Sequence, residues 1–270
     1  MKCKIIQSNK AIALLLTFFS LTITYSQEAE ILYQKEYSKL SFVFQPSILK
    51  KSEAANSDGS RYPSMEFTND FSYQFGVYYN FAQYRNFNFK TGLIAKEFIP
   101  KFDLNISDSD IGNGEENFLT QFDPFSQFIL SVPLKAEYFL KLNNKLNLSF
   151  GAGINLNIVT GTNAETSVGV SVGNSTGYFK DVFSLTSEKQ NNVNFSSEFS
   201  LGLNYKTRFA LIDLSFYINN MLHSNYTSGH YQIYNLNQSP DKTGNYEIKN
   251  NFYGISLSVS PKKGWLKSNN

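Results

Sequence analysis

The sequence predicts an all-β fold, an eight-stranded antiparallel up-and-down transmembrane β-barrel with four long outer loops and short periplasmic turns. Three observations predict it. Eight segments alternate apolar and polar residues with a period of two, the pattern of strands with two unlike faces. Most of these segments have ten or more residues, about the length that a tilted strand needs to cross a bilayer. The connections between them alternate long and short, so all long connections fall at one end of the meander.

Residues 1–26 read as a secretory signal peptide. Three early lysines precede an apolar run at 11–25, and Thr24 and Ser26 are small enough for a cleavage site. The run is shorter than the roughly 20 apolar residues of a spanning helix, which argues against a membrane anchor. The remaining chain divides into a periplasmic N-terminal segment (27–38), the barrel domain (39–260) and a periplasmic C-terminal tail (261–270).

Composition limits the classes of function. The formal net charge is +2, and three lysines lie in the signal segment, so no basic surface argues for nucleic acid. The only cysteine, Cys3, lies in the same segment, so we expect no disulfide and no cysteine metal site. We also expect no cofactor. Aromatic residues make up 16% of the chain although its mean hydropathy is −0.29. This combination fits aromatic side chains that face lipid around a polar interior.

The clearest hairpin occupies residues 195–218. In 195–205, most of the odd-numbered residues are apolar, and the residues between them are polar or glycine. Residues 206–208 form a turn, and the alternation resumes at 210. The other six strands show the same period. In chain order they are expected at 39–48, 71–81, 87–97, 127–140, 146–158 and 252–260.

The connections predict the topology. The long ones are 49–70, 98–126, 159–192 and 219–251, and the short ones are 82–86, 141–145 and 206–208. Long loops are uncommon in compact domains, and their occurrence at every second connection is typical of outer-membrane barrels. A soluble lipocalin-like barrel would point its apolar face inward. Eight inward rows of phenylalanine and tyrosine would overfill so narrow a barrel, which favours the membrane alternative.

The chain resembles the small outer-membrane β-barrel proteins of Bacteroidota, the group that includes the secretion protein PorT. The likeness rests on three short stretches, Ser131-Val132-Pro133-Leu134, Gly151-Ala152-Gly153 and Ile218-Asn219-Asn220-Met221-Leu222. It implies the barrel architecture and an accessory role in an envelope or secretion complex. The chain differs from the family pattern in one respect. It does not end on an aromatic residue of the last strand, since residues 261–270 continue past that strand.

One strand contains a proline. Pro133 cannot donate to a strand ladder, and a closed barrel has no edge where the loss would be harmless. We therefore expect a β-bulge at Pro133.

The inward faces carry charged residues. If the aromatic faces meet lipid, six charged side chains point inside: Lys90, Lys96, Lys135, Glu137, Glu198 and Asp213. Isolated charges are costly in a narrow interior, so these groups are expected to pair as a structural network that plugs the barrel. The alternative is a narrow pore, which the small bore of an eight-stranded barrel disfavours.

Two candidate sites lie in the long connections. Ser224 beside His223, with His230 nearby, suggests a lipid A hydrolase, but adjacent residues rarely converge and no acid has suggestive spacing. The acidic stretch 108–116 has asparagine where an EF-hand needs its glycine and leucine where it needs its glutamate. We expect neither a catalytic nor a metal site.

The sequence therefore predicts a non-catalytic outer-membrane protein with a structural or interaction role. Its polar loops, dense in Asn, Ser, Gly and Tyr, are the best recognition surface. The expected partners are outer-membrane lipid and lipopolysaccharide, together with other envelope or secretion-system proteins through the family resemblance.

Overall fold

The structure of the chain is a computed structural model. It describes residues 36–50, 52–56, 61–68, 71–98, 101–106, 118–122, 127–160, 164–172, 178–189, 193–222, 227–235, 240–248 and 251–264. The predicted signal peptide lies outside the described residues. No helix in the described part of the chain is long and apolar enough to cross a membrane.

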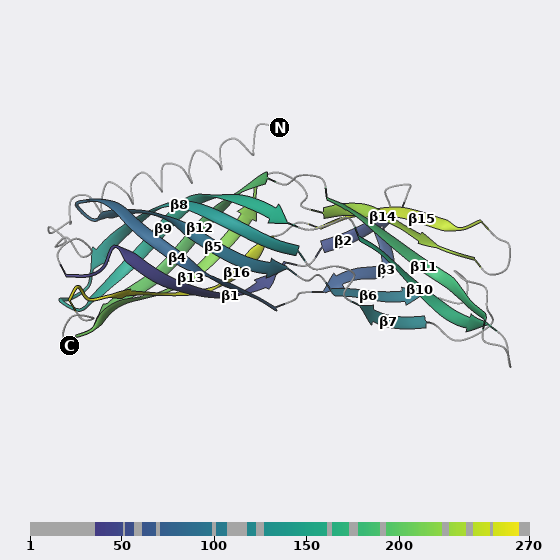
Figure 1. The fold of residues 1–270 in the computed structure, drawn as a ribbon, viewed down its shortest axis with the longest axis horizontal. Coiled ribbons are helices and arrows are strands. Elements are labelled where there is room, and N and C mark those ends of the chain that lie inside the picture. Colours follow the sequence, from purple (N-terminus) through teal and green to yellow (C-terminus); the bar gives the residue numbers. More distant parts are fainter. Residues whose placement is uncertain are drawn as a thin grey trace, which may run out of the picture.

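Eight long strands form a closed antiparallel barrel in the cyclic order β1-β16-β13-β12-β9-β8-β5-β4 (Figure 1). Every predicted strand is present, and the predicted fold class is confirmed. The first and last strands close the barrel through pairs such as Phe42 with Val259. The strands are β1 (Leu40–Leu49), β4 (Phe71–Tyr84), β5 (Phe87–Phe98), β8 (Gln127–Lys141), β9 (Leu146–Thr160), β12 (Val193–Lys206), β13 (Ala210–Met221) and β16 (Phe252–Pro261).

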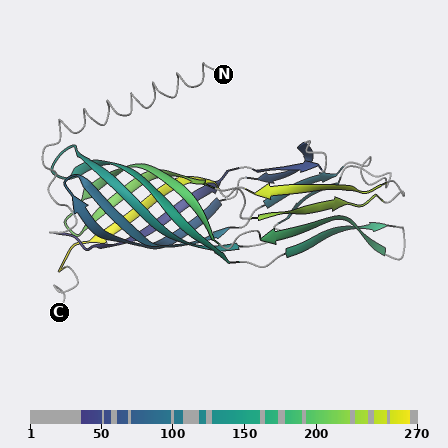
Figure 2. The same ribbon diagram turned by 90° about the horizontal axis from the view of Figure 1, so that it is seen from above.

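The four long connections hold a second sheet. Each contributes one pair of antiparallel strands, and the pairs join in the order β10-β11-β14-β15-β2-β3-β6-β7. This outer sheet extends from one end of the barrel along its long axis (Figures 1 and 2). Its strands are β2 (Ser52–Asn56), β3 (Arg61–Thr68), β6 (Lys101–Ile106), β7 (Phe118–Phe122), β10 (Ala164–Val172), β11 (Tyr178–Lys189), β14 (Thr227–Ile233) and β15 (Lys242–Ile248). The described parts of these connections are thus strands rather than the irregular loops expected.

The barrel wall is apolar outside and polar inside. Along β12, Phe199 and Leu201 are more than half exposed, whereas Glu198 and Asn204 are buried. β13 alternates in the same way, with exposed Leu214 against buried Asp213. An apolar exterior around a polar interior is the arrangement that a bilayer requires, because lipid solvates the outward side chains.

The outer sheet has the opposite polarity. Phe102 and Leu104 of β6 are fully buried, and the residue between them, Asp103, is partly exposed. The rings of Phe102 and Tyr246 meet edge to face at 5.8 Å, although their strands are not neighbours. The sheet therefore curves around an apolar core and presents its polar face to water. The buried apolar residues of this core are Phe102, Leu104, Val182, Phe183, Leu185, Tyr231, Ile233 and Tyr246.

The bulge expected at Pro133 is not found. β5 and β8 keep one register on both sides of it, from Thr91 opposite Leu134 to Ile94 opposite Ser131, with no backbone pairs between. Proline removes the donor without adding a residue, so the ladder is interrupted instead of shifted. The Thr91 hydroxyl donates to the Pro133 carbonyl at 2.8 Å and replaces part of what is lost. The register shift in this region lies between Asn80 and Ala82, on β4.

Candidate functional site

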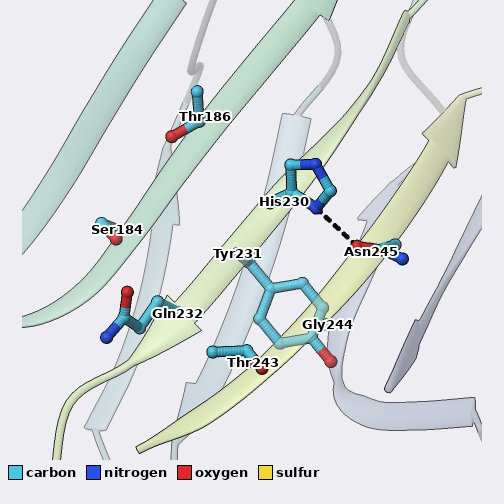
Figure 3. Close-up of a pocket in the computed structure, with 8 residues that line it drawn as sticks. All are labelled: Ser184, Thr186, His230, Tyr231, Gln232, Thr243, Gly244 and Asn245. Atoms are coloured by element: carbon cyan, nitrogen blue, oxygen red, sulfur yellow. Dashed lines mark hydrogen bonds between the residues drawn. The ribbon is translucent and has the colours of Figure 1, made fainter. Parts of the chain in front are cut away.

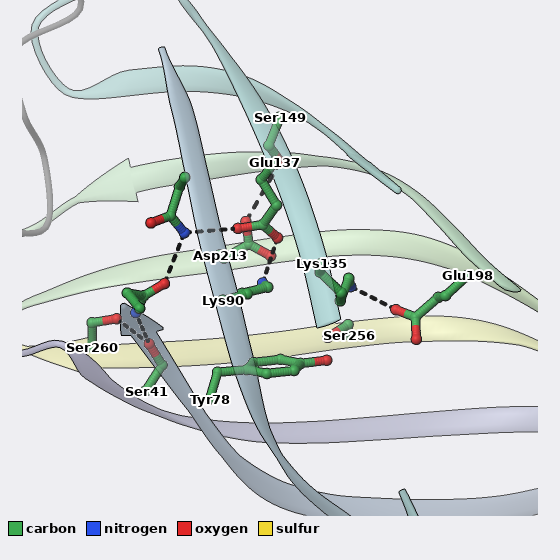
Figure 4. Close-up of polar contacts among 12 residues, drawn as sticks. Ser41, Tyr78, Lys90, Lys135, Glu137, Ser149, Glu198, Asp213, Ser256 and Ser260 are labelled. Atoms are coloured by element: carbon green, nitrogen blue, oxygen red, sulfur yellow. Dashed lines mark hydrogen bonds and ion pairs between the residues drawn. The ribbon is translucent and has the colours of Figure 1, made fainter. Parts of the chain in front are cut away.

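The six predicted interior charges all lie buried inside the barrel. They form two ion pairs, one between Lys90 and Glu137 and one between Lys135 Nζ and Glu198 Oε1 at 2.6 Å (Figure 4). The ring of buried Tyr78 lies beneath both pairs, with Lys90 Nζ 4.3 Å from its centroid. Cation–π contact and ion pairing together compensate charges that would otherwise be costly in this interior.

Glycines make room for these pairs. Gly153 of β9 stands between Lys135 of β8 and Glu198 of β12 in the strand register. A Cβ added at Gly153 would lie 2.6 Å from Lys135 Cγ and 2.7 Å from the Leu134 carbonyl oxygen. The lysine can therefore reach across β9 to its carboxylate only because position 153 has no side chain.

The remaining two charges are held differently. Lys96 lies near the outer end of the barrel, with Nζ 4.6 Å from the centroid of the Phe252 ring. Asp213 lies in the half of the barrel nearer the short turns, where it accepts a 3.5 Å hydrogen bond from Ser149. Among the described residues no ion pair joins either group. The structure thus brings four of the six predicted residues into two pairs.

A hydrogen-bonded chain links the charges to the wall. Asn88 Nδ2 donates to Glu137 at 3.4 Å and to Asn80 Oδ1 at 2.8 Å, and Asn80 donates to Ser41 at 3.2 Å. The Ser41 and Ser260 hydroxyls are 2.6 Å apart (Figure 4). Such a network ties strands from opposite ends of the chain and fills the interior with side chains.

Apolar layers lie at both ends of this polar interior. At the end near the short turns, Tyr37, Phe139 and Leu211 form a buried cluster. At the outer end, each of four barrel strands places an apolar residue inward. These residues are Leu49, Ile129, Val159 and Phe252, all at most 2% exposed. Charged groups between two apolar layers make the described interior a poor path for ions.

A polar site lies on the outer face of the outer sheet, across β11, β14 and β15 (Figure 3). The register aligns two rows of side chains there. One row is Thr186, His230 and Asn245, and the other is Ser184, Gln232 and Thr243. Together with Gly244 and Tyr231 they line a depression of about 300 Å³, which we call the outer-face site.

Hydrogen bonds fix the long side chains of the outer-face site. His230 Nδ1 and Asn245 Oδ1 are 2.6 Å apart, so Nδ1 carries the hydrogen and donates. Gln232 Nε2 donates to Asp241 Oδ2 at 2.8 Å. These bonds leave His230 Nε2, Asn245 Nδ2 and Gln232 Oε1 available to a ligand.

Most of the candidates for catalysis and metal binding fall outside the part of the chain that the structure describes. His223, Ser224 and the acidic stretch 108–116 lie outside the described residues. His230 faces Thr186 across the ladder, but no hydrogen bond joins the two side chains, and hydroxyl activation requires one. In the described ranges, no three His, Cys, Asp or Glu side chains gather closely enough to bind a metal ion.

The sequence did not predict the outer-face site, because the pairing of its strands cannot be seen when those segments are interpreted as loops. Its residues fall in two connections that were expected to be irregular. The sequence does carry one signal, because Phe183 and Leu185 alternate with polar residues, as Tyr231 and Ile233 do. This period of two predicts strands with an apolar face.

The geometry defines the class of protein. A closed barrel of eight antiparallel strands leaves no unpaired edge in lipid, and the exterior here is apolar over the length of the strands. Short turns at one end and long excursions at the other complete the architecture of an integral outer-membrane β-barrel. The protein is therefore an outer-membrane β-barrel with a folded outer sheet.

No protein-family model matches this chain, and no curated protein matches it. Solved structures that resemble it include Neisserial surface protein A (TM-score 0.38, 13% identity, 83% of this chain and 97% of that one). Another is Ail, the attachment invasion locus protein of Yersinia pestis (TM-score 0.32, 13% identity, 83% of this chain and 99% of that one). A third is the outer membrane protease OmpT of Escherichia coli (TM-score 0.36, 9% identity, 87% of this chain and 97% of that one). At these TM-scores we draw nothing from the likenesses about function.

Proposed function

We propose that this protein is a non-catalytic recognition protein of the outer membrane, which binds a partner through the outer sheet. The barrel acts as the anchor, and the outer sheet acts as the binding surface. Outer-membrane lipid and lipopolysaccharide surround the barrel in this proposal.

The observation that carries the proposal is the reversal of polarity between the two sheets. A loop that only connects two strands has no need of an apolar core, yet Phe102, Phe183 and Tyr231 are buried in one. The core makes the outer sheet a folded unit whose outward polar residues keep fixed positions. Recognition surfaces are typically built on rigid scaffolds of this kind, because binding then costs less ordering entropy.

A second candidate is an accessory subunit of an envelope or secretion complex. The resemblance to the PorT-like proteins of Bacteroidota supports it, and such a subunit would also use the short turns or the terminal segments on the periplasmic side. The exposed residues Asn143 and Lys145 form one of these turns. The fold alone does not distinguish the two candidates, because one fold can support many functions.

Two other functions have less support. A pore would need a continuous wet path, whereas ion pairs and apolar layers fill the described barrel interior. A lipid A hydrolase would need a nucleophile hydrogen-bonded to its base, and in the described outer sheet His230 bonds instead to Asn245.

The test places a photo-crosslinking amino acid at Thr243 on the outer sheet, or at Lys145 in the periplasmic turn, in living cells. Leu214, which is exposed on the lipid face of the barrel, is the matched control. A discrete adduct with a partner macromolecule at Thr243 alone is the expected result.

An adduct at Lys145 alone would replace this proposal with the accessory-subunit candidate. If Thr243 and Lys145 gave only the lipid adducts of the Leu214 control, a recognition role through either end would be wrong.

A further inference from the structure

The outer-face site is chemically uniform. The two aligned rows contain two threonines, a serine, two amides and one imidazole, and none of the eight described lining residues, which also include Tyr231 and Gly244, carries a permanent charge. The neighbouring carboxylate of Asp241 is engaged, since Gln232 Nε2 and the Asn235 backbone N–H both donate to it. An anionic ligand would therefore find no opposite charge among the described lining residues, and a cation would find only this hydrogen-bonded carboxylate beside the site, although ion pairing is what usually holds such ligands.

The available groups include both donors and acceptors. Asn245 Nδ2 donates, His230 Nε2 and Gln232 Oε1 accept, and the hydroxyls of Thr186 and Thr243 do both. An apolar ligand would leave these groups without partners and would bind poorly. A ligand that matches them must itself offer donors and acceptors close together, as a sugar with several hydroxyl groups does.

The dimensions agree with this chemistry. Neighbouring strands lie about 4.8 Å apart, and side chains on one face repeat about every 6.8 Å along a strand. Two rows over three strands thus present six polar groups over an area of about 10 by 7 Å. The depression of about 300 Å³ lies at the lower end of the usual range for small-molecule sites.

The site is also ordered before any ligand arrives. His230 is held by Asn245, and Gln232 is held by Asp241, so the imidazole and the longer amide of the two rows keep their orientation. The Ser184 hydroxyl lies 3.1 Å from the Tyr234 hydroxyl, which fixes it in turn. Ordering of this kind lowers the entropy cost of binding.

We propose that the outer-face site binds a neutral saccharide unit, with His230, Gln232 and Asn245 as its main hydrogen-bonding residues. This inference rests on the proposed recognition function and names the ligand class of the outer sheet. Aligned polar rows on adjacent strands, hydrogen bonds that hold them and the absence of charged lining residues carry it.

The experiment uses the full chain in nanodiscs against an array of neutral hexose and N-acetylhexosamine oligosaccharides, printed beside sialylated and sulfated ones. The strongest neutral probe is then titrated by calorimetry. Gln232→Ala and Thr243→Val each remove one hydrogen-bonding group, and we expect each to weaken binding about tenfold. Asn105→Ala, an exposed amide on β6 outside the site, is the matched control and should bind like the parent.

Folding of each variant is checked by its heat-dependent gel mobility. Neutral-probe binding that survives both site variants, binding of acidic glycans alone, or no binding to any probe would overturn the saccharide proposal. The last outcome together with a Thr243 crosslink to a protein would leave the recognition function standing. Absence of both glycan binding and a partner crosslink at Thr243 would contradict the recognition function itself.

Discussion

Removal of the Glu198 carboxylate should be among the most destabilising single changes in the barrel. Glu198→Ala leaves the Lys135 ammonium without its partner at 2.6 Å, in a position where the two side chains are only 3% and 6% exposed. It also removes the acceptor of a 3.1 Å hydrogen bond from Asn155. Loss of one partner of a buried ion pair costs roughly 3–5 kcal/mol, so the folding equilibrium constant should fall by a factor of about 10² to 10⁴.

The double variant Lys135→Met/Glu198→Leu should recover most of this loss, because it removes both charges. The assay is the fraction of folded barrel on unboiled gels against urea concentration, for the parent, both single variants and the double. Lys145→Ala, in an exposed turn, is the control and should stay within about 0.5 kcal/mol of the parent. A Glu198→Ala variant as stable as this control, or single effects that simply add in the double variant, would refute the proposed ion-pair energetics.

Three further outcomes are expected. Phe199→Arg, on the lipid face near the middle of β12, should destabilise the barrel in urea titrations by about 2–4 kcal/mol, whereas Asn105→Arg on the outer sheet should not; equal effects would contradict the assigned polarity. A membrane-impermeant maleimide should label Asn245→Cys on intact cells, and Thr207→Cys only after permeabilisation; the reverse would invert the topology. The purified protein in planar bilayers should show no stable unitary conductance, and reproducible current steps would disprove the sealed interior.

The barrel could be predicted from the sequence because its rule is local. A strand in lipid must alternate over ten or more residues, and this length makes the period of two visible in every segment. The same alternation identified which charges point inward. It could not identify their partners, since Lys90 lies opposite Lys135 in the ladder yet pairs with Glu137 two residues along. Ion pairing depends on side-chain reach across the barrel and on space left by residues such as Gly153.

The outer sheet is hard to predict because most of its strands are short and lie in polar surroundings, with β11, which has 12 residues, as the exception. β6 has only six residues, and Phe102 and Leu104 alone give too little repetition to separate a strand from a loop. The strand pairing of the outer sheet also joins connections that are distant in sequence, and a single sequence does not reveal such contacts. The prediction of a bulge at Pro133 was wrong for a different reason. A missing donor can be tolerated by an interrupted ladder and a threonine hydroxyl, so an extra residue is not needed.

The outer-face site depends on two different hairpins. Thr186 belongs to the excursion between β9 and β12, whereas His230 and Asn245 belong to the one between β13 and β16. The rows align because β11 pairs with β14, and the barrel strands that follow and precede these two, β12 and β13, pair with each other, so we expect the site to form only after these two excursions have come together. A ligand or antibody that contacts residues of both excursions would recognise only molecules in which these excursions have paired, and its binding would measure how many such molecules a living cell displays.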